Sequence, residues 1–531
     1  MRLSTITSPR ARSAVLAAAM AMALTAARAA APAGILATPV TVTLNPNGNA
    51  PLSAVAVFTT KNDALVQVDV QGEIPVTHLE SAPGKTHAVP ILGLYPGRTN
   101  MVVLTIRAPR LKPEVQTLSI TTGPLPAFFP AVSVIASNAP LMEPGMNLCA
   151  FQYSSGGVLR SFPFMVDAGG AVRWYLDLSA YNGPCLPFRR LADGNFVFAA
   201  AQEIHEIDSL GHETSALGIP GYTLHDEIIE LPNGNLACAA DKPGTTIING
   251  TGLIPSRGDI MIEVDRRSGA IRTELDMRAI LQVDRNQQLN NDGDWFHMNG
   301  IVYSAADDTF ILSGRHQGVV KVGRDNSLKW ILDAHHNWTY SGPNNSGPKP
   351  TNYLLTAVDA AGAPYPGEPF QDDGAALSPF DWPWSQRTPL LLPNGNVLVF
   401  DSGFERNYIL GPPFYSRAVE YAVDESVHTV FQVWEYGMER GTDLYSPFAG
   451  NVQDLAMTGN RLFTAGMNQG TAGPQARIVE VAYPGNAVVF EAAVLFRNLA
   501  STGTAYGQYD LADFMTRLPL YPPEPLLRPR I

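Results

Sequence analysis

Hydrophobic and polar residues alternate in short runs along most of the chain. Between residues 34 and 122 these runs are separated by turn residues such as Pro46-Asn47-Gly48. Because alternation with a period of two is typical of half-buried β-strands, the pattern predicts a small β-sandwich over residues 34–122. The segment Gly123-Pro124-Leu125-Pro126 is its predicted linker to the rest of the chain.

A hairpin pattern repeats six times after this linker. Each copy is a strand that ends in an acidic or small residue, a polar turn and a second apolar strand. The copies begin at Met165, His205, Ile262, Val320, Val419 and Val479. A second turn-and-strand element, often containing Asn-Gly or Asp-Gly, recurs at residues 191, 231, 305, 392 and 457.

Two such elements in each repeat give four strands per unit. A unit of this kind, with a period of about 40–60 residues, predicts an all-β fold with a six-bladed β-propeller over residues 127–531. An irregular assembly of sandwiches is the alternative, but it does not explain why the same turn chemistry recurs. The longest interval, between the fourth and fifth copies, contains His335, His336 and the Pro/Gly/Asn-rich segment 341–350. It predicts an excursion near one mouth of the propeller.

The first 31 residues have the pattern of a signal peptide. Arg2, Arg10 and Arg12 precede an apolar run over residues 14–27 that is too short to span a bilayer. We therefore expect a signal peptide over residues 1–31, no membrane span, and a periplasmic or secreted protein. An N-terminal anchor is the alternative.

Composition narrows the classes of partner. The chain of 531 residues has 36 Lys and Arg against 48 Asp and Glu, which gives a net charge of −12. Because nucleic-acid binders need a basic surface, we expect no nucleic-acid partner, and attachment to anionic lipid by charge is disfavoured. Three cysteines, Cys149, Cys185 and Cys238, cannot form a four-cysteine zinc site, and at most one pair could form a disulfide.

Three polar segments depart from the repeat. They are Leu224–Glu227, Asp294–Asn299 and Ser313–Gln317. The first two occupy matching positions in successive units, so we expect His225 and His297 to face the central channel, with Arg315 and His316 at a strand end beside them. Arginine offers a planar fork to sulfate or phosphate oxygens, and imidazole can donate a proton, accept one or act as a nucleophile. These residues predict a site for a tetrahedral oxyanion.

A metal site is the rival interpretation of these histidines. We expect no metal, because no two histidines have ligand spacing along the chain and no cysteines are close together. Aromatic residues near these segments could form a wall for a flat organic substrate, or could simply fill the core. They are Trp295, Phe296, Trp382, Trp384 and Tyr445.

Several segments closely resemble the bacterial arylsulfate sulfotransferase family. They are the run over residues 294–322, the His-Asp-Glu element over 225–235 and the run over 415–441. The resemblance covers most of residues 34–480. It implies a periplasmic enzyme with an N-terminal β-sandwich and a six-bladed propeller. Such an enzyme moves a sulfuryl group from a phenolic sulfate ester to a phenolic acceptor, both small molecules, without a cofactor or a nucleotide donor. A homodimer is also implied.

The resemblance assigns roles residue by residue. It implies that His225 and His297 polarise the sulfate and assist the phenol oxygens, and that Arg315 binds the sulfate. It also implies that Asn299 is a polar neighbour in the same motif. We therefore expect Asn299, His316 and Trp295 to contact substrate beside the catalytic groups.

One position departs from the family pattern. The family's nucleophilic histidine, which forms a sulfohistidine, lies in a Trp-x-Gln-His-Thr-like segment, but this chain has Trp384-Ser385-Gln386-Arg387-Thr388. A guanidinium group stays protonated and has no lone pair suited to attack. Arg387 is therefore expected in the site, but not as the nucleophile.

Three outcomes follow from Arg387. Sulfuryl transfer could use His316, His225 or His297 as the nucleophile. Transfer or hydrolysis could instead be direct, with Arg387 holding the sulfate. Alternatively, the protein could bind aryl sulfates without turning them over. A quinone-dependent propeller dehydrogenase is disfavoured, because the chain lacks a repeated Trp docking motif and an adjacent cysteine pair.

Overall fold

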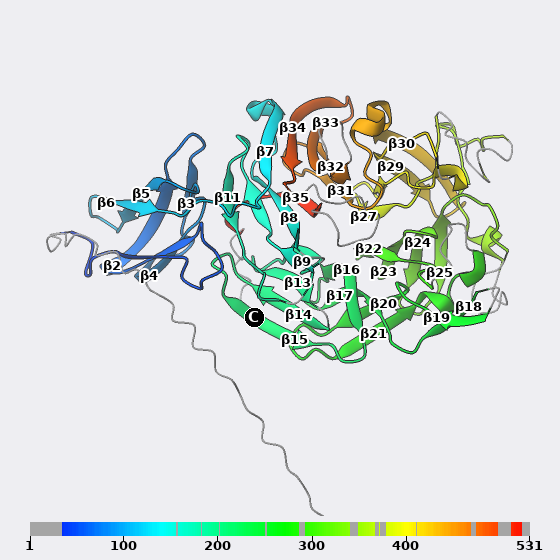
Figure 1. The fold of residues 1–531 in the computed structure, drawn as a ribbon, viewed down its shortest axis with the longest axis horizontal. Coiled ribbons are helices and arrows are strands. Elements are labelled where there is room, and N and C mark those ends of the chain that lie inside the picture. Colours follow the sequence, from blue (N-terminus) through cyan, green and yellow to red (C-terminus); the bar gives the residue numbers. More distant parts are fainter. Residues whose placement is uncertain are drawn as a thin grey trace, which may run out of the picture.

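The structure is a computed structural model, and almost all of its regular secondary structure is β-strand (Figure 1). It describes residues 34–155, 158–181, 183–200, 202–249, 252–285, 293–339, 349–366, 371, 379–409, 411–468, 474–497 and 511–522. The prediction of an all-β chain is confirmed. The predicted signal peptide lies outside the described residues. Within them, no helix has the length and hydrophobicity needed to cross a bilayer.

The N-terminal sheet has six strands, in the order β1-β2-β5-β6, and β3 and β4 also pair with β2. Its strands are β1 (Thr41–Leu44), β2 (Ala54–Val70), β3 (Val76–Leu79), β4 (Gly84–Ile91), β5 (Thr99–Arg107) and β6 (Glu114–Thr121). The sequence pattern predicts separate strands over 54–60 and 65–70, and this is wrong. The exposed residues 61–63 continue the strand at a register shift, so β2 runs through both segments.

Six further sheets of four or five strands follow in the described residues. The first sheet contains β8 (Met146–Ser155), β9 (Val158–Ser161), β10 (Phe164–Val166), β11 (Val172–Tyr175) and β35 (Leu511–Leu518). The second contains β12 (Phe188–Arg190), β13 (Phe196–Ala200), β14 (Glu203–Ile207) and β15 (Glu213–Gly218). The third contains β16 (Thr223–Glu230), β17 (Leu236–Asp241), β20 (Ile260–Val264) and β21 (Ile271–Asp276). The separate hairpin β18 (Thr246–Asn249) and β19 (Gly252–Pro255) lies between β17 and β20 in the chain.

The last three sheets are built in the same way. The fourth sheet contains β22 (Met298–Ser304), β23 (Thr309–Gly314), β24 (Gly318–Gly323) and β25 (Leu328–Leu332). The fifth contains β26 (Thr356–Ala357), β27 (Arg387–Leu391), β28 (Val397–Asp401), β29 (Arg417–Asp424) and β30 (Thr429–Tyr436). The sixth contains β31 (Gly450–Asp454), β32 (Arg461–Asn468), β33 (Gln475–Ala482), β34 (Ala487–Leu495) and β7 (Ala131–Ser137). Short 3-10 helices lie at Ala139–Leu141, Met277–Ala279, Val283–Arg285, Pro350–Asn352, Arg406–Tyr408 and Met438–Asp443.

The predicted hairpins are all present. They are β10–β11, β14–β15, β20–β21, β24–β25, β29–β30 and β33–β34. The second turn element joins β12 to β13, β16 to β17, β22 to β23, β27 to β28 and β31 to β32. Local alternation and turn chemistry were therefore sufficient to find the six hairpins and the five turns that precede their neighbouring strands.

The six sheets follow one another around a common centre, which β16, β22, β27, β31 and β35 approach most closely (Figure 1). Strand β16 contacts β22, β22 contacts β27, and β27 contacts β31. The two ends of this region are exchanged between neighbouring sheets. Strand β7 pairs with β34 of the sixth sheet, and β35 pairs with β8 of the first. Phe151 and Ile478 share one hydrophobic cluster, which packs the first sheet against the sixth.

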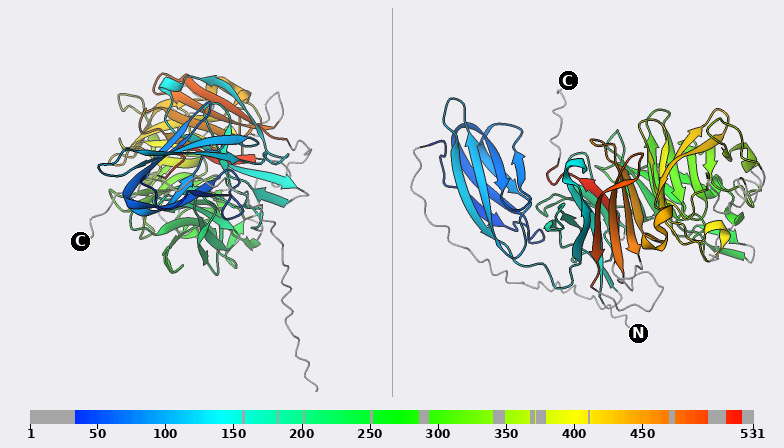
Figure 2. Two further views of the ribbon diagram at one scale, coloured as in Figure 1. Left: turned by 90° about the vertical axis from the view of Figure 1, so that its left-hand side faces the viewer. Right: turned by 90° about the horizontal axis from the view of Figure 1, so that it is seen from above.

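The N-terminal sheet lies beside the first of these sheets (Figure 2). Arg173 of β11 is fully buried, donates a 2.9 Å hydrogen bond to the Gly93 carbonyl and stacks on the Tyr95 ring. The Tyr521 hydroxyl, just after β35, accepts a 2.9 Å hydrogen bond from the Leu92 amide. These contacts fix the N-terminal sheet next to the place where the first sheet receives β35.

Hydrogen bonds from the turn asparagines to a buried glutamate give a reason for the recurring Asn-Gly turn. Glu263 of β20 accepts hydrogen bonds from Asn233 and Asn235 of the turn before β17 and pairs with Arg324 of the next sheet. In that next sheet the charges are reversed, because Lys321 pairs with Asp307 at 2.6 Å. The residues of the repeated turn therefore form turns and also take part in hydrogen bonds and ion pairs that link strands and sheets.

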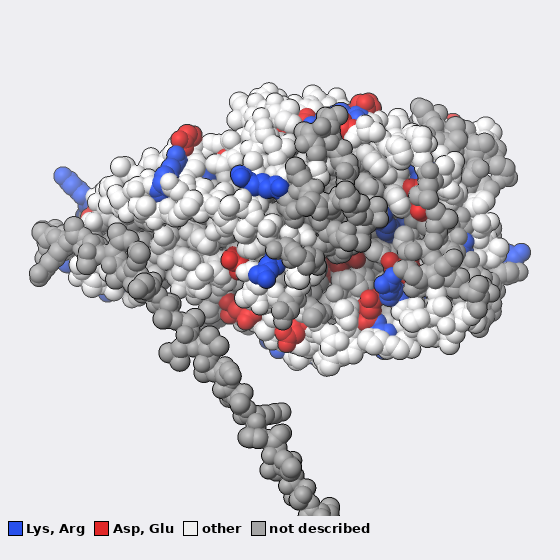
Figure 3. Space-filling view, viewed as in Figure 1, with Lys and Arg blue, Asp and Glu red and all other residues white. Residues whose placement is uncertain are grey.

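The interval between β25 and β27 holds the two adjacent histidines. The His335 Nε2 atom lies 2.8 Å from the Leu355 carbonyl, and the His336 ring packs on Tyr408. Most of segment 341–350 lies outside the described residues, so the predicted excursion stays a prediction there. On the face shown in Figure 3, described acidic and basic side chains are scattered and form no broad patch of one sign.

Candidate functional site

The inner ends of three successive sheets carry the same backbone irregularity. Register shifts interrupt β16 after His225, β22 after Met298 and β27 after Arg387. Beside them, three non-glycine residues have positive φ angles, namely Asp226 (45°), His297 (55°) and Thr388 (43°). Bulges re-aim side chains, and strained backbone of this kind is concentrated at functional sites. The candidate site is built at these three bulges.

His225 faces the centre from β16. Its Nδ1 atom lies 3.1 Å from Asp226 Oδ2, and its Nε2 atom lies 3.7 Å from Asp241 Oδ1. Burial alone would lower the pKa of His225, but the carboxylates of Asp226, Asp241 and Asp294 outweigh it and raise that pKa. Within the described structure, the buried Nε2 atom has no hydrogen-bond partner. A donor left in this state is suited to a ligand oxygen.

His297 faces the same space from the loop before β22. Its Nδ1 atom lies 2.6 Å from Asp294 Oδ2, which fixes the ring and leaves Nε2 directed towards Asp226 at 3.7 Å. A Cβ atom at Gly258 would lie 2.9 Å from the His297 Cα, so only glycine permits this close approach. The Arg315 amide donates a 3.0 Å hydrogen bond to the His297 carbonyl. The two predicted residues are therefore held together by backbone.

Arg315 is buried beside the site. Its guanidinium donates a 3.0 Å hydrogen bond to the Pro447 carbonyl and lies over the rings of Phe404 and Phe448. Burial, together with the nearby charge of Arg387, lowers the pKa of Arg315 to about 10. The group is still protonated at neutral pH. Two arginines that repel each other in a buried site favour the binding of an anion.

Arg387 opens β27 and reaches the same centre. Its Nη2 atom lies 3.0 Å from Asp513 Oδ2 on β35 and 3.6 Å from Asp226 Oδ1. Its Nη1 atom donates to the Phe448 carbonyl. The guanidinium is therefore held between two carboxylates, close to His225 and His297.

Asn299 and Trp295 support the site from behind. The Asn299 amide nitrogen donates a 2.9 Å hydrogen bond to the Gln386 carbonyl, and its oxygen accepts one from Ser313. Trp295 is buried in a hydrophobic cluster and donates a 3.0 Å hydrogen bond to Asp259. Both side chains thus make contacts that position the site, and their contact with substrate stays a prediction.

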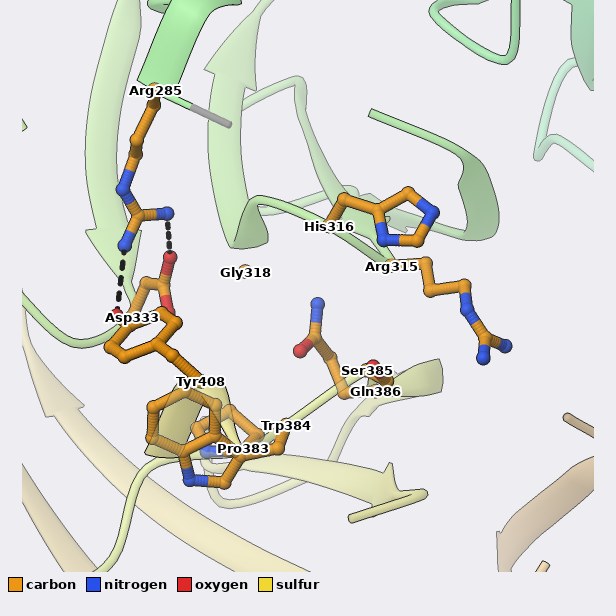
Figure 4. Close-up of a pocket in the computed structure, with 10 residues that line it drawn as sticks. All are labelled: Arg285, Arg315, His316, Gly318, Asp333, Pro383, Trp384, Ser385, Gln386 and Tyr408. Atoms are coloured by element: carbon orange, nitrogen blue, oxygen red, sulfur yellow. Dashed lines mark hydrogen bonds and ion pairs between the residues drawn. The ribbon is translucent and has the colours of Figure 1, made fainter. Parts of the chain in front are cut away.

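His316 lies next to His297, with ring centroids 5.6 Å apart. Burial, His297 and Arg315 lower the pKa of His316 well below its usual value, so its imidazole is neutral at neutral pH. Arg315 and His316 also line a small pocket whose other residues are Arg285, Gly318, Asp333, Pro383, Trp384, Ser385, Gln386 and Tyr408 (Figure 4). Across that pocket Arg285 pairs with Asp333, and the Gln386 amide donates a 2.7 Å hydrogen bond to Gly314.

Three groups in the site have the spacing of metal ligands. Potential ligand atoms of Asp294, His297 and His316 all lie within 4.8 Å of one another. The sequence analysis missed this set, because the fold and not the spacing along the chain brings His316 to His297. The nearby cationic Arg315 disfavours a bound cation. The three cysteines are buried free thiols and form no disulfide.

The aromatic residues near the site differ from those expected. Trp295, Phe296 and Trp382 are buried in hydrophobic clusters, and Trp384 packs edge-on against Tyr408. The rings closest to Arg315 are instead Phe404 and Phe448, whose centroids are 5.2 Å apart. Tyr445, the fifth candidate, packs on Phe414 at 5.3 Å. A partly exposed aromatic surface therefore borders Arg315.

Sequence reasoning missed the carboxylates of the site. Asp226 and Asp294 lie inside the polar segments that it singled out, next to His225 and three residues before His297. Those positions were signals that it could have used. Asp513 has no such signal, because only the pairing of β35 with β8 brings it to Arg387.

Comparison with known proteins shows the family of the chain. The family model for arylsulfotransferase (ASST) matches residues 132–506, and the model for the arylsulfotransferase Ig-like domain matches residues 41–123. The chain is 31% identical over 367 residues to the arylsulfate sulfotransferase AssT of Escherichia coli O6:H1, covering 60% of this chain and 58% of that protein. It is 27% identical over 520 residues to the AssT of Lelliottia amnigena, covering 80% and 84%.

Solved structures show only slight likeness. A protein of unknown function from Bacteroides caccae has a TM-score of 0.38 at 12% identity, covering 68% of this chain and 96% of that one. Another, from Bacteroides thetaiotaomicron, has a TM-score of 0.33 at 11% identity, covering 86% and 98%. The assignment therefore rests on the sequence match over residues 41–123 and 132–506: the chain belongs to the arylsulfotransferase family.

Proposed function

We propose that the six sheets after the linker are the blades of a six-bladed β-propeller, with the site at the inner strands. Six sheets of four or five strands around one centre, and the exchange of β7 and β35 at the closure, support this architecture. Residues 34–122 are then a separate N-terminal sandwich. The N-terminal basic and apolar run supports export to the periplasm or the outside.

The activity that fits this site is transfer of a sulfuryl group from an aryl sulfate ester to a phenol. The observation that carries it is the convergence of Arg315, Arg387, His225 and His297 at the inner ends of successive sheets. The buried His225 Nε2 atom has no hydrogen-bond partner in the described structure. Such a set neutralises a sulfate group and protonates a leaving oxygen. The rings of Phe404 and Phe448 offer a surface to the aryl group.

His297 is the candidate nucleophile in this chain. Asp294 holds its Nδ1 atom, so Nε2 is the nitrogen that can attack sulfur. In that step the bond from sulfur to the aryl oxygen breaks, an N–S bond forms, and the leaving phenolate takes a proton from His225. A phenol then attacks the sulfuryl group, the N–S bond breaks, and the acceptor proton returns to His225. Arg315 and Arg387 stay protonated throughout.

The test is turnover of a chromogenic aryl sulfate by the mature protein, with and without a phenol. We expect release of the chromophore that depends on the acceptor, and an intact mass that increases by one SO₃ when the acceptor is left out. Peptide mapping should place this adduct on His297. Release without acceptor would indicate a sulfatase, and binding without release would indicate a site that has lost its chemistry.

The variant Arg387→His sharpens this test. It restores the histidine of the family pattern, and we expect turnover to rise by about 10²-fold or more, because a second activated nucleophile enters the site. The adduct should then move to residue 387. If turnover falls while the protein still folds, Arg387 is needed for sulfate binding and the histidine cannot replace it.

A further inference from the structure

One carboxylate lies between the basic groups of the site. Oxygen atoms of Asp226 lie 3.1 Å from His225 Nδ1, 3.7 Å from His297 Nε2 and 3.6 Å from Arg387 Nη2. These groups come from β16, from the loop before β22 and from β27. The sequence patterns described above assign no role to Asp226.

The backbone conformation at Asp226 determines where this carboxylate lies. Asp226 has a φ of 45° at the bulge of β16, so its side chain and that of His225 point to the same region. In a regular strand, two consecutive side chains point to opposite faces. The next residue, Glu227, pairs with Arg189 at 2.8 Å. The positive φ at Asp226 therefore lets its carboxylate reach His297 and Arg387.

Two ordinary roles fit Asp226 poorly. The neighbouring His225, His297 and Arg387 outweigh burial and hold the pKa of Asp226 well below its usual value, so it is a weak proton acceptor. It is also not the main partner of Arg387, because Asp513 lies closer to that guanidinium, at 3.0 Å. The carboxylate is instead a permanent negative charge at the point where the donors converge.

We propose that Asp226 is an internal counter-ion whose carboxylate occupies, before substrate binds, the place that a sulfate oxygen takes. An arriving sulfate ester has to displace the carboxylate, because the Asp226 oxygens lie against His297 Nε2 and Arg387 Nη2, two of the nitrogens that the ester must reach. Displacement also frees the His297 Nε2 atom to reach sulfur. Asp226 therefore limits affinity for sulfate groups and promotes release of a sulfated product. This inference rests on the proposed function.

The test is the affinity for inorganic sulfate, measured by calorimetry on the mature protein without turnover. We expect Asp226→Asn, which keeps the shape and removes the charge, to tighten sulfate binding by about tenfold or more. The control is Asp513→Asn, which removes a charge beside Arg387 but leaves the Asp226 contacts with the histidines in place. Its effect should be clearly smaller. In the turnover assay, Asp226→Asn should lower KM and also kcat, because product release slows.

Other outcomes overturn the proposal. Unchanged or weaker sulfate binding by a folded Asp226→Asn variant, or an equal gain in the Asp513 variant, excludes an internal counter-ion. If the asparagine variant does not fold, Asp226→Ser provides the same comparison. Arg315→Met separates the two hypotheses: if wild type binds sulfate and this variant does not, the anion site is real even if the Asp226 proposal fails. If wild type binds no sulfate, the proposal fails together with the proposed function.

Discussion

Two clusters of arginine and aspartate side chains in this protein differ in how tightly their ion pairs close. In the first, Asp401 and Asp381 lie among Arg406 and Arg417, with ion pairs of 2.5–2.9 Å and almost no exposure. The Asp401 carboxylate also accepts the Trp384 amide at 2.9 Å. In the second, Asp226 and Arg387 lie 3.6 Å apart and the Asp226 side chain is 27% exposed. The Asp401 cluster therefore holds in place the segment that runs from Trp384 to Arg387 of the Asp226 cluster.

The difference teaches how to separate a structural ion network from a ligand site. Buried charges are costly unless their partners satisfy them, and breaking such a set leaves an uncompensated charge. The Asp401 cluster satisfies its carboxylates with protein atoms. At the Asp226 cluster the contacts are long, and among the described residues the His225 Nε2 atom has no hydrogen-bond partner, so the cluster can accept an incoming group. The next three predictions test this contrast.

Asp401→Ala should have the largest effect. It leaves Arg406 and Arg417 buried without their shared carboxylate, so we expect a loss of about 3–5 kcal/mol in the free energy of unfolding. Chemical denaturation measures this loss. Asp424→Ala, at the exposed last residue of β29, is the matched control and should change stability by less than about 0.5 kcal/mol. An equally small effect at Asp401 would show that the tight cluster does not stabilise the fold.

Arg315→Met should damage function more than stability. We expect kcat/KM for an aryl sulfate to fall by about 10²–10³-fold, which is the usual loss when one oxyanion donor is removed. The unfolding midpoint should change little, because the variant removes one of two charges that repel each other. The exposed Arg272 gives the control Arg272→Met, with unchanged turnover. A large drop in stability with unchanged kcat/KM would show that Arg315 stabilises the fold and does not bind the substrate.

The pH dependence of sulfate binding should report His225. Its pKa is raised above the ordinary 6.5, so the imidazolium is stabilised in the folded protein and donates to an anion below that pKa. Sulfate affinity should therefore be highest at low pH and fall by about tenfold as pH rises through the raised pKa. The matching contribution to stability is lost over the same range. In His225→Asn this step should disappear; if it persists, another group is titrating.

The sequence predicted those parts of the molecule that depend on local pattern. Alternating residues and Asn-Gly turns identified the six hairpins, and polar segments located His225, His297 and Arg315. The pattern failed at residues 61–63, because a polar tripeptide can continue a strand as an exposed bulge. It also could not show that β7 and β35 change sheets, since strand exchange depends on packing between distant segments.

The site itself was predictable only in part for the same reason. Each histidine has a local motif, but the positive φ at Asp226 and the approach of Asp513 to Arg387 arise from the assembled sheets. The sequence left open whether the aromatic candidates border the substrate or fill the core. In the structure Trp295 and Trp382 fill the core, whereas Phe404 and Phe448 lie beside Arg315. Residue type alone does not separate these two uses.

The place of Asp513 on β35 has a consequence for the order in which the protein matures. A nascent chain carries His225, His297 and Arg315 long before β35 is synthesised. Arg387 gains its closest carboxylate, and the first sheet its fifth strand, only when residues 511–518 arrive. A prematurely ended chain therefore lacks both the fifth strand of the first sheet and the closest carboxylate of Arg387, so the sheet and the site are completed by the same late segment.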